Sequence, residues 1–192
     1  MSTPGCDPRL PGQGPSTAPA APAPRPPIQQ GDAYLQLVNA GSGLCLDVRD
    51  ESLQAGADVV VSACGGAVTQ RWNLGRDGLI RNLADPAYCL DADDGANGAV
   101  GVRPCSPTDS PDEVFSITAA GAIRVASDPR FPAVVVVLAP VGNRPGSGVR
   151  PRAAAKADGP DKPNGPNGPN GPNGPGSGSS RLWYPGAAET PR

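Results

Sequence analysis

The feature that most constrains how this chain can fold is an internal repeat with a period of about 40 residues. Four pairs of segments match at offsets of 41 to 44 residues: 42–48 with 87–92, 56–64 with 98–105, 70–72 with 113–115, and 77–81 with 120–124. The last match begins a third unit, which lacks both the Cys-Leu-Asp motif and the cysteines of the first two. A unit of this size is too small to bury its own apolar face, so three units must share one core.

Short strands separated by turn residues fill each unit. Tyr34–Val38, Leu44–Val48 and Val59–Ala63 are rich in β-branched and aliphatic residues, and clusters of Gly, Asn or Asp separate them. No window shows the 3.6-residue apolar period of an amphipathic helix together with a cap. The sequence therefore predicts an all-β domain.

The third unit contains a Pro-Asn-Gly tract where the repeat should continue. Phe115 and Trp183 are 68 residues apart, and removing the 28 residues 153–180 leaves 40, close to the repeat period. We therefore predict that 153–180 is a low-complexity insertion within the third repeat, so that the chain returns to the core at Trp183. Such an insertion is tolerable because the entropy of loop closure grows only logarithmically, by about 0.6 kcal/mol per doubling of length.

The chain contains 26 prolines and 26 glycines, and the prolines cluster outside the repeats. Residues 1–31 resemble a disordered Ala/Pro-rich linker, because such a segment cannot bury enough apolar surface to offset its ordering entropy. The expected domain is then 32–186, with a tail at 187–192. Residues 1–31 lack a basic and then apolar signal segment. Either the start codon lies upstream, or the domain descends from the tail of a larger secreted or membrane protein.

Four of the five cysteines lie inside the repeats, at positions 45, 64, 89 and 105. Two successive pairs of similar spacing suggest the local disulfides Cys45–Cys64 and Cys89–Cys105, although four cysteines permit three pairings. Each bridge would stabilise the fold by about 3 kcal/mol and implies an oxidising, extracellular or cell-surface location. A cytoplasmic protein with reduced thiols is the alternative that the absent signal favours. Cys6 reads as an unpaired linker thiol.

Composition argues against several functions. The chain has no histidine and a net charge of −2, so it lacks the commonest general base and any basic footprint for nucleic acid. The longest apolar run, Pro132–Val141, is too short to enter a membrane as a span. We expect no cofactor and no metal site, since no paired CxxC motifs occur and the acidic segment Asp91–Gly98 fails the calcium-loop pattern.

Catalysis is not expected either. The adjacent carboxylate pairs Asp50–Glu51 and Asp112–Glu113 should lie exposed in turns, rather than facing one another across a cleft as glycoside hydrolysis requires. Gly41-Ser42-Gly43 does not have the spacing of a nucleophile elbow.

The repeated motif resembles the ricin-type lectin family. The resemblance rests on the Cys-Leu-Asp unit, the second strand that ends in Cys, and Gln-x-Trp, and it extends from Tyr34 to Tyr184 without the insertion. It implies a β-trefoil with pseudo-threefold symmetry, in which Trp72, Phe115 and Trp183 occupy the shared core. The family includes modules of actinobacterial glycoside hydrolases, and the many arginines suggest a GC-rich, actinobacterial source.

The resemblance also implies one sugar pocket per repeat. The aspartate of Cys-x-Asp accepts hydrogen bonds from sugar hydroxyls, and the alternative for such an aspartate is a bond to its own turn. The aromatic residue that stacks on the sugar in the family is absent here. The candidate carbohydrate-binding residues are Asp47, Ser62, Thr69 and Gln70 in the first repeat, and Asp91, Arg103 and Asp112 in the second.

Two functions follow from these residues. The first is a non-enzymatic carbohydrate-binding module that recognises a glycan or polysaccharide weakly, through the first repeat and to a smaller extent the second. The second is a degenerate β-trefoil that serves as a protein-interaction or structural module. Arg103 could pair with an anionic glycan or form a salt bridge to Asp91 or Asp112.

Overall fold

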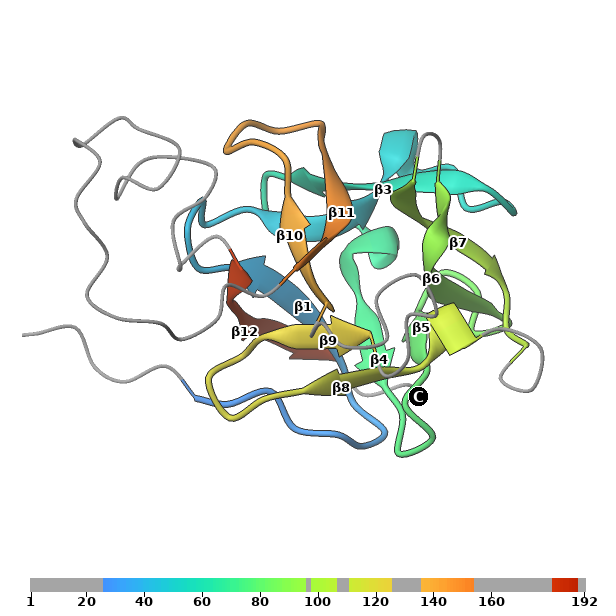
Figure 1. The fold of residues 1–192 in the computed structure, drawn as a ribbon, viewed down its shortest axis with the longest axis horizontal. Coiled ribbons are helices and arrows are strands. Elements are labelled where there is room, and N and C mark those ends of the chain that lie inside the picture. Colours follow the sequence, from blue (N-terminus) through green and yellow to red (C-terminus); the bar gives the residue numbers. More distant parts are fainter. Residues whose placement is uncertain (1–25, 96–97, 107–110, 126–135, 154–180, 190–192) are drawn as a thin grey trace, which may run out of the picture.

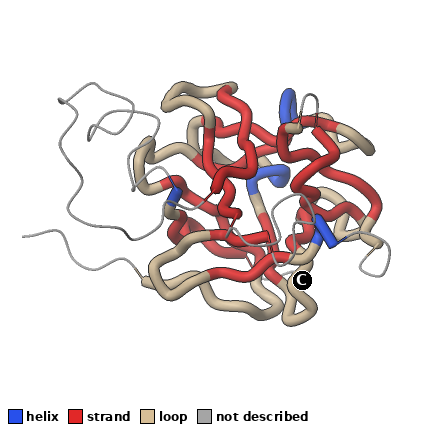
Figure 2. The backbone as a smooth tube through the Cα atoms, in the orientation of Figure 1, coloured by secondary structure: helices blue, strands red, loops and turns tan. Residues whose placement is uncertain are grey.

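The computed structural model describes residues 26–95, 98–106, 111–125, 136–153 and 181–189. Strands dominate these residues, and the helical segments among them are short 3-10 turns, with no α-helix (Figure 2). Within the same residues, none of the helical turns has the length or apolarity to cross a membrane. Residues 1–25 of the expected linker 1–31, which include Cys6, lie outside the described residues. Of the expected insertion 153–180, only Ala153 is described, as the last residue of a strand.

In the described part of the chain, twelve strands form three successive groups of four (Figure 1). The first repeat contains β1 (Tyr34–Asn39), β2 (Cys45–Val48), β3 (Ala57–Ser62) and β4 (Trp72–Leu74). The second contains β5 (Ile80–Asn82), β6 (Tyr88–Gly95), β7 (Ala99–Pro104) and β8 (Phe115–Ile117). The third contains β9 (Ile123–Val125), β10 (Val136–Pro140), β11 (Ser147–Ala153) and β12 (Trp183–Glu189). The 3-10 turns are η1 (Arg49–Glu51), η2 (Val68–Gln70) and η3 (Pro111–Glu113).

The outer strands of the repeats form a barrel. Strand β1 pairs with β4 of its own repeat, β4 pairs with β5, and β8 pairs with β9. Antiparallel pairing of β1 with β12, from Tyr34↔Glu189 to Asn39↔Trp183, joins the first and third repeats. Strands near the two ends of the described chain therefore provide each other's backbone hydrogen-bond partners.

The inner strands of each repeat form a hairpin, and the three hairpins meet. Strand β3 pairs with both β7 and β11, so the hairpin of the first repeat contacts the other two. The registers of the hairpins are equivalent: Cys45↔Ser62, Cys89↔Arg103 and Val137↔Arg152. Barrel strands with hairpins arranged in three equivalent units are the β-trefoil expected from the sequence.

Three aromatic side chains occupy equivalent buried places in the core. Trp72, Phe115 and Trp183 are all buried. The indole Nε1 of Trp72 donates to the carbonyl of Leu46 at 3.0 Å, and Trp183 repeats this bond to the carbonyl of Leu138 at 3.1 Å. The repeated bond shows that Trp183 stands in the third repeat where Trp72 stands in the first.

Both predicted disulfides are present. Cys45 is joined to Cys64 and Cys89 to Cys105, each within one repeat. Each bridge joins a cysteine at the beginning of one hairpin strand to a cysteine one or two residues beyond the end of its partner strand. The bridges therefore hold together the two strands of the first hairpin and of the second.

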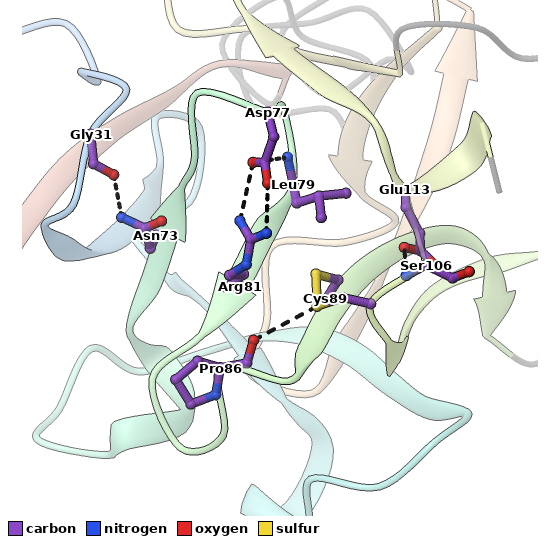
Figure 3. A network of polar contacts seen from close by, with 10 residues as sticks. Gly31, Asn73, Asp77, Leu79, Arg81, Pro86, Cys89, Ser106 and Glu113 are labelled. Carbon is purple, nitrogen blue, oxygen red and sulfur yellow. Dashed lines mark hydrogen bonds and ion pairs between the residues drawn. A yellow bond between two sulfur atoms is a disulfide. The ribbon is translucent and has the colours of Figure 1, made fainter. Parts of the chain in front are cut away.

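Described residues on both sides of the expected limits, 32 and 186, pack against the barrel or pair with its strands. Ile28 is buried in the core, and Asn73 donates a hydrogen bond to the carbonyl of Gly31, so the last residues of the expected linker pack on the barrel (Figure 3). Strand β12 continues to Glu189, into the expected tail. Pairing with β1 explains this extension, because the full length of β1 has a partner only if β12 continues that far.

Candidate functional site

Each repeat has one place, which we call the pocket position, formed by three residues. The first lies two positions after Cys45, or after the equivalent Cys89 or Val137. The second pairs with that same cysteine or valine across the hairpin. The third lies two positions before the buried aromatic residue of the repeat. The three sets are Asp47, Ser62 and Gln70; Asp91, Arg103 and Glu113; and Ala139, Arg152 and Arg181.

In the first repeat a buried carboxylate is held by donors from the protein. Asp47 is only 4 % exposed. Its Oδ1 accepts hydrogen bonds from the backbone N–H of Val48 and from Thr69 Oγ1, both at 2.8 Å, and its Oδ2 accepts one from Gln70 Nε2 at 2.9 Å. A carboxylate offers about four acceptor sites. Oδ2 therefore has capacity for one more donor. The bond from Val48 is the contact with its own turn that the sequence offered as the alternative role of Asp47.

Gln70 is fixed by contacts on both ends of its amide. Besides Asp47, Nε2 donates to the carbonyl of Ala63 at 2.9 Å. Oε1 accepts from the backbone of Gly65 at 2.8 Å and from Gln36 Nε2 at 3.2 Å. All four hydrogen-bonding sites of the amide are thus used, so Gln70 orients Asp47 and has no group left for a ligand.

Thr69 and Ser62 differ in what they can offer a ligand. Thr69 is buried on η2 and gives its hydroxyl proton to Asp47, so it can only accept from a ligand. Ser62 is half-buried at the end of β3, opposite Cys45. The structure therefore brings together Asp47, Thr69 and Gln70, with Ser62 at the edge of the group.

In the second repeat an arginine fills the pocket position. Arg103 Nη1 lies 3.2 Å from Asp91 Oδ2, and Arg103 Nε lies 3.5 Å from Glu113 Oε1. Both carboxylates are buried, whereas the Arg103 side chain is 42 % exposed. The salt bridge to Asp91 is one of the alternatives that the sequence left open. The Asp91 carboxylate is therefore already paired with a guanidinium group of the protein.

The expectation that Asp112 and Glu113 form an exposed pair is wrong for Glu113. Its side chain is 0 % exposed, and its Oε2 accepts a 2.7 Å hydrogen bond from the backbone N–H of Ser106 (Figure 3). Asp112 is half-buried on η3, at the place that Thr69 has on η2. Glu113 was missed as a site residue, although its alignment with Gln70 was a usable signal. A glutamate there cannot donate to Asp91, so Arg103 connects the two.

We expect Arg103→Ser to lower the free energy of unfolding by about 2 kcal/mol, because it leaves two buried carboxylates without their guanidinium partner. Adding Glu113→Gln recreates the arrangement of the first repeat and should recover most of the loss. Urea unfolding of both variants measures these effects.

The matched control is Arg49→Ser, which removes the more exposed ion pair between Arg49 and Asp58 and should cost less than about 0.5 kcal/mol. A double variant no more stable than Arg103→Ser alone would contradict the assigned role of Arg103.

A separate ion pair supports the turn before β5. Arg81 Nη2 lies 2.6 Å from Asp77 Oδ2, and this hydrogen bond holds the pKa of Asp77 below its ordinary value (Figure 3). Burial raises the pKa of Tyr34. Neither Asp77 nor Tyr34 is one of the three residues that form a pocket position.

The comparisons with known proteins agree with this geometry. The family described as the ricin-type beta-trefoil lectin domain matches residues 33–130, which is slightly more than half of the chain. The chain belongs to the ricin-type lectin family. The matched residues cover the first two repeats, where the Cys-Leu-Asp motifs and disulfides lie. The third repeat of this ricin-type domain shares the fold but lacks those motifs.

Solved structures share the fold of this ricin-type domain across all three repeats. The C-terminal half of an earthworm R-type lectin, solved with GalNAc, has a TM-score of 0.60 at 14% identity, covering 82% of this chain and 99% of that one. The β-trefoil lectin of the Vibrio vulnificus hemolysin/cytolysin, solved with N-acetyl-D-lactosamine, has a TM-score of 0.60 at 18% identity, covering 83% and 98%. ThreeFoil, a designed threefold symmetric protein, has a TM-score of 0.51 at 18% identity, covering 80% and 98%. No curated protein sequence matches.

Proposed function

We propose that this domain is a non-catalytic carbohydrate-binding module whose first repeat recognises a glycan weakly. The observation that carries the proposal is the buried Asp47 carboxylate, oriented by Gln70 and with acceptor capacity remaining on Oδ2. Charge-assisted hydrogen bonds from a sugar hydroxyl to such a fixed carboxylate are the strong kind. Two similar folds were solved with GalNAc and N-acetyl-D-lactosamine, which supports a glycan as the ligand class.

Two features explain why binding would be weak. Ser62 provides no aromatic surface on which the apolar face of a sugar could stack. In the second repeat Asp91 already has Arg103 as its partner, so this repeat would contribute little. The same two features favour the second candidate, a degenerate trefoil used as a protein-interaction or structural module.

The disulfides support an extracellular or cell-surface location, because such bridges persist in oxidising compartments. An actinobacterial source, the proposed fusion to a larger secreted or membrane protein, and the absence of nucleic-acid partners stay predictions.

The decisive experiment is a glycan array probed with the whole chain and with Asp47→Asn and Asp91→Asn. The lost charge-assisted bond should reduce binding by Asp47→Asn about tenfold, whereas Asp91→Asn should leave it nearly unchanged. Because Asp47 is buried, Ser62→Trp supplies an independent test. Restoring an aromatic surface should strengthen binding to the same glycans, with Ser62→Ala as its control. Binding to no glycan, even by Ser62→Trp, would favour the degenerate trefoil.

A further inference from the structure

The pocket position of the third repeat has the opposite charge from the other two. Ala139 stands where Asp47 and Asp91 stand, Arg152 occupies the place of Ser62, and Arg181 occupies the place of Gln70. The pocket position of the third repeat therefore has no carboxylate and contains two arginines.

The placement of Arg181 follows from the core tryptophans. Gln70 precedes Trp72 by two residues and contacts Asp47, the residue after Leu46. Arg181 precedes Trp183 by two residues, and the Trp183 indole bonds to the carbonyl of Leu138, the residue before Ala139. The same geometry thus puts Arg181 beside Ala139.

Two more arginines share this face. Val137 pairs with Arg124 of β9 on one side and with Arg152 of β11 on the other, and directly paired residues project from the same face of a sheet. Arg150 pairs with Ala139 and lies two residues before Arg152, so it projects from that face as well. Strands β9 and β11 flank β10, which places them two strand spacings or about 10 Å apart, and long guanidinium side chains from both can reach one extended ligand.

Among the residues that the structure describes, these arginines have no acidic partner of the kind that Arg103 has. Strands β8, β9, β10 and β11 contain no Asp or Glu. Over the described ranges, no hydrogen bond or ion pair engages the guanidinium groups of Arg124, Arg150, Arg152 or Arg181. Arg124 and Arg152 are exposed, and Arg150 and Arg181 are half-buried. The contrast with Arg103 is direct, because its partners Asp91 and Glu113 are replaced here by Ala139 and Arg181.

We propose that the third repeat is a separate site for an anionic polysaccharide, in which Arg150, Arg152 and Arg181 bind carboxylate or sulfate groups and Arg124 extends the site along β9. Guanidinium groups suit this ligand because their planar donors match carboxylate and sulfate oxygens in pairs. The choice of a polysaccharide rests on the proposed function of the domain. The anion site itself does not depend on Asp47.

The net charge of the chain favours binding of a polyanion at one local site rather than attraction to the whole protein. The whole chain carries a charge of −2, so its overall electrostatics disfavour a polyanion. Retention on a polyanion must then come from one face of the molecule.

The test is binding of the whole chain to immobilised dextran sulfate and polygalacturonate, with neutral dextran as the uncharged reference. The double variant Arg150→Gln/Arg152→Gln should weaken binding to at least one polyanion about tenfold or more, since it removes charge-assisted bonds. The charge-matched control Arg49→Gln/Arg76→Gln changes two exposed arginines outside the third repeat, one on η1 and one in the turn before β5, and should change binding less than about twofold. The two polyanions distinguish sulfate from carboxylate as the group recognised.

Three results would overturn the proposal: no binding to either polyanion at low salt, equal weakening by both double variants, or equally tight binding to single-stranded DNA. The last result would replace a polysaccharide with a nucleic acid. Asp47→Asn separates this proposal from the first, because it should weaken neutral glycan binding and leave polyanion binding intact. If neutral glycans fail to bind while the arginine-dependent polyanion binding persists, only the first-repeat site is wrong.

Discussion

A chain that ends at Ala153 is expected to show no cooperative unfolding transition. Such a chain lacks β12, which pairs along β1, and it lacks the buried Trp183. Loss of a buried tryptophan side chain alone costs about 3–5 kcal/mol, and typical domains have only about 5–15 kcal/mol to lose. Urea titration followed by circular dichroism measures the transition.

The control for truncation is an internal deletion of residues 157–176, which keeps 181–192. Because closure entropy depends only weakly on length, this deletion should change the free energy of unfolding by less than about 1 kcal/mol. The pair of chains tests whether 153–180 is an insertion. A chain ending at Ala153 that unfolds like the full chain would refute that interpretation.

The second large effect is expected from Gly121→Ala. Gly121 has a φ of +91°, and an added Cβ would overlap the carbonyl oxygen of Trp183. The backbone N–H of Trp183 also donates to the carbonyl of Gly121 at 2.9 Å, so neither residue can move away without losing this bond. Strain at a positive φ together with a backbone overlap should lower the free energy of unfolding by about 3 kcal/mol or more.

Gly43→Ala is the matched control for Gly121→Ala. Its φ is +69°, but an added Cβ would meet nothing within 4 Å. Only the backbone strain remains, and this should cost about 1–2 kcal/mol. Similar losses in the two variants by thermal and urea unfolding would show that the contact of Gly121 with Trp183 is unimportant.

Local sequence could predict the fold because each repeat carries its own signals. The strand expected at Val59–Ala63 and the pairing of Cys45 with Cys64 depend only on residues close together in the chain. The position of Trp183 required one further argument, the period of the repeat. The end of the last strand was harder to predict, since the extension of β12 to Glu189 depends on pairing with β1.

The charged contacts at the pocket positions could not be predicted from individual residues in the sequence. Glu113 looks like a turn residue in the sequence, and only the fold brings it against Arg103 and buries it. Likewise, the hydrogen bond from Thr69 to Asp47 joins η2 to β2, so neither residue alone reveals that the hydroxyl is already used. Pairings across the fold decide which side chains of a pocket remain available to a ligand.

The pairing of β1 with β12 has a consequence for how the domain is synthesised. Asn39 and Leu182, which interact next to this pair, are 143 residues apart. Contacts of such separation slow folding, and ribosomes extend chains at about 5–20 residues per second. The barrel edge at β1 must therefore wait several seconds for its partner. The cysteines of the two disulfides are only 19 and 16 residues apart, each pair within one repeat, so these bridges do not require the last strand.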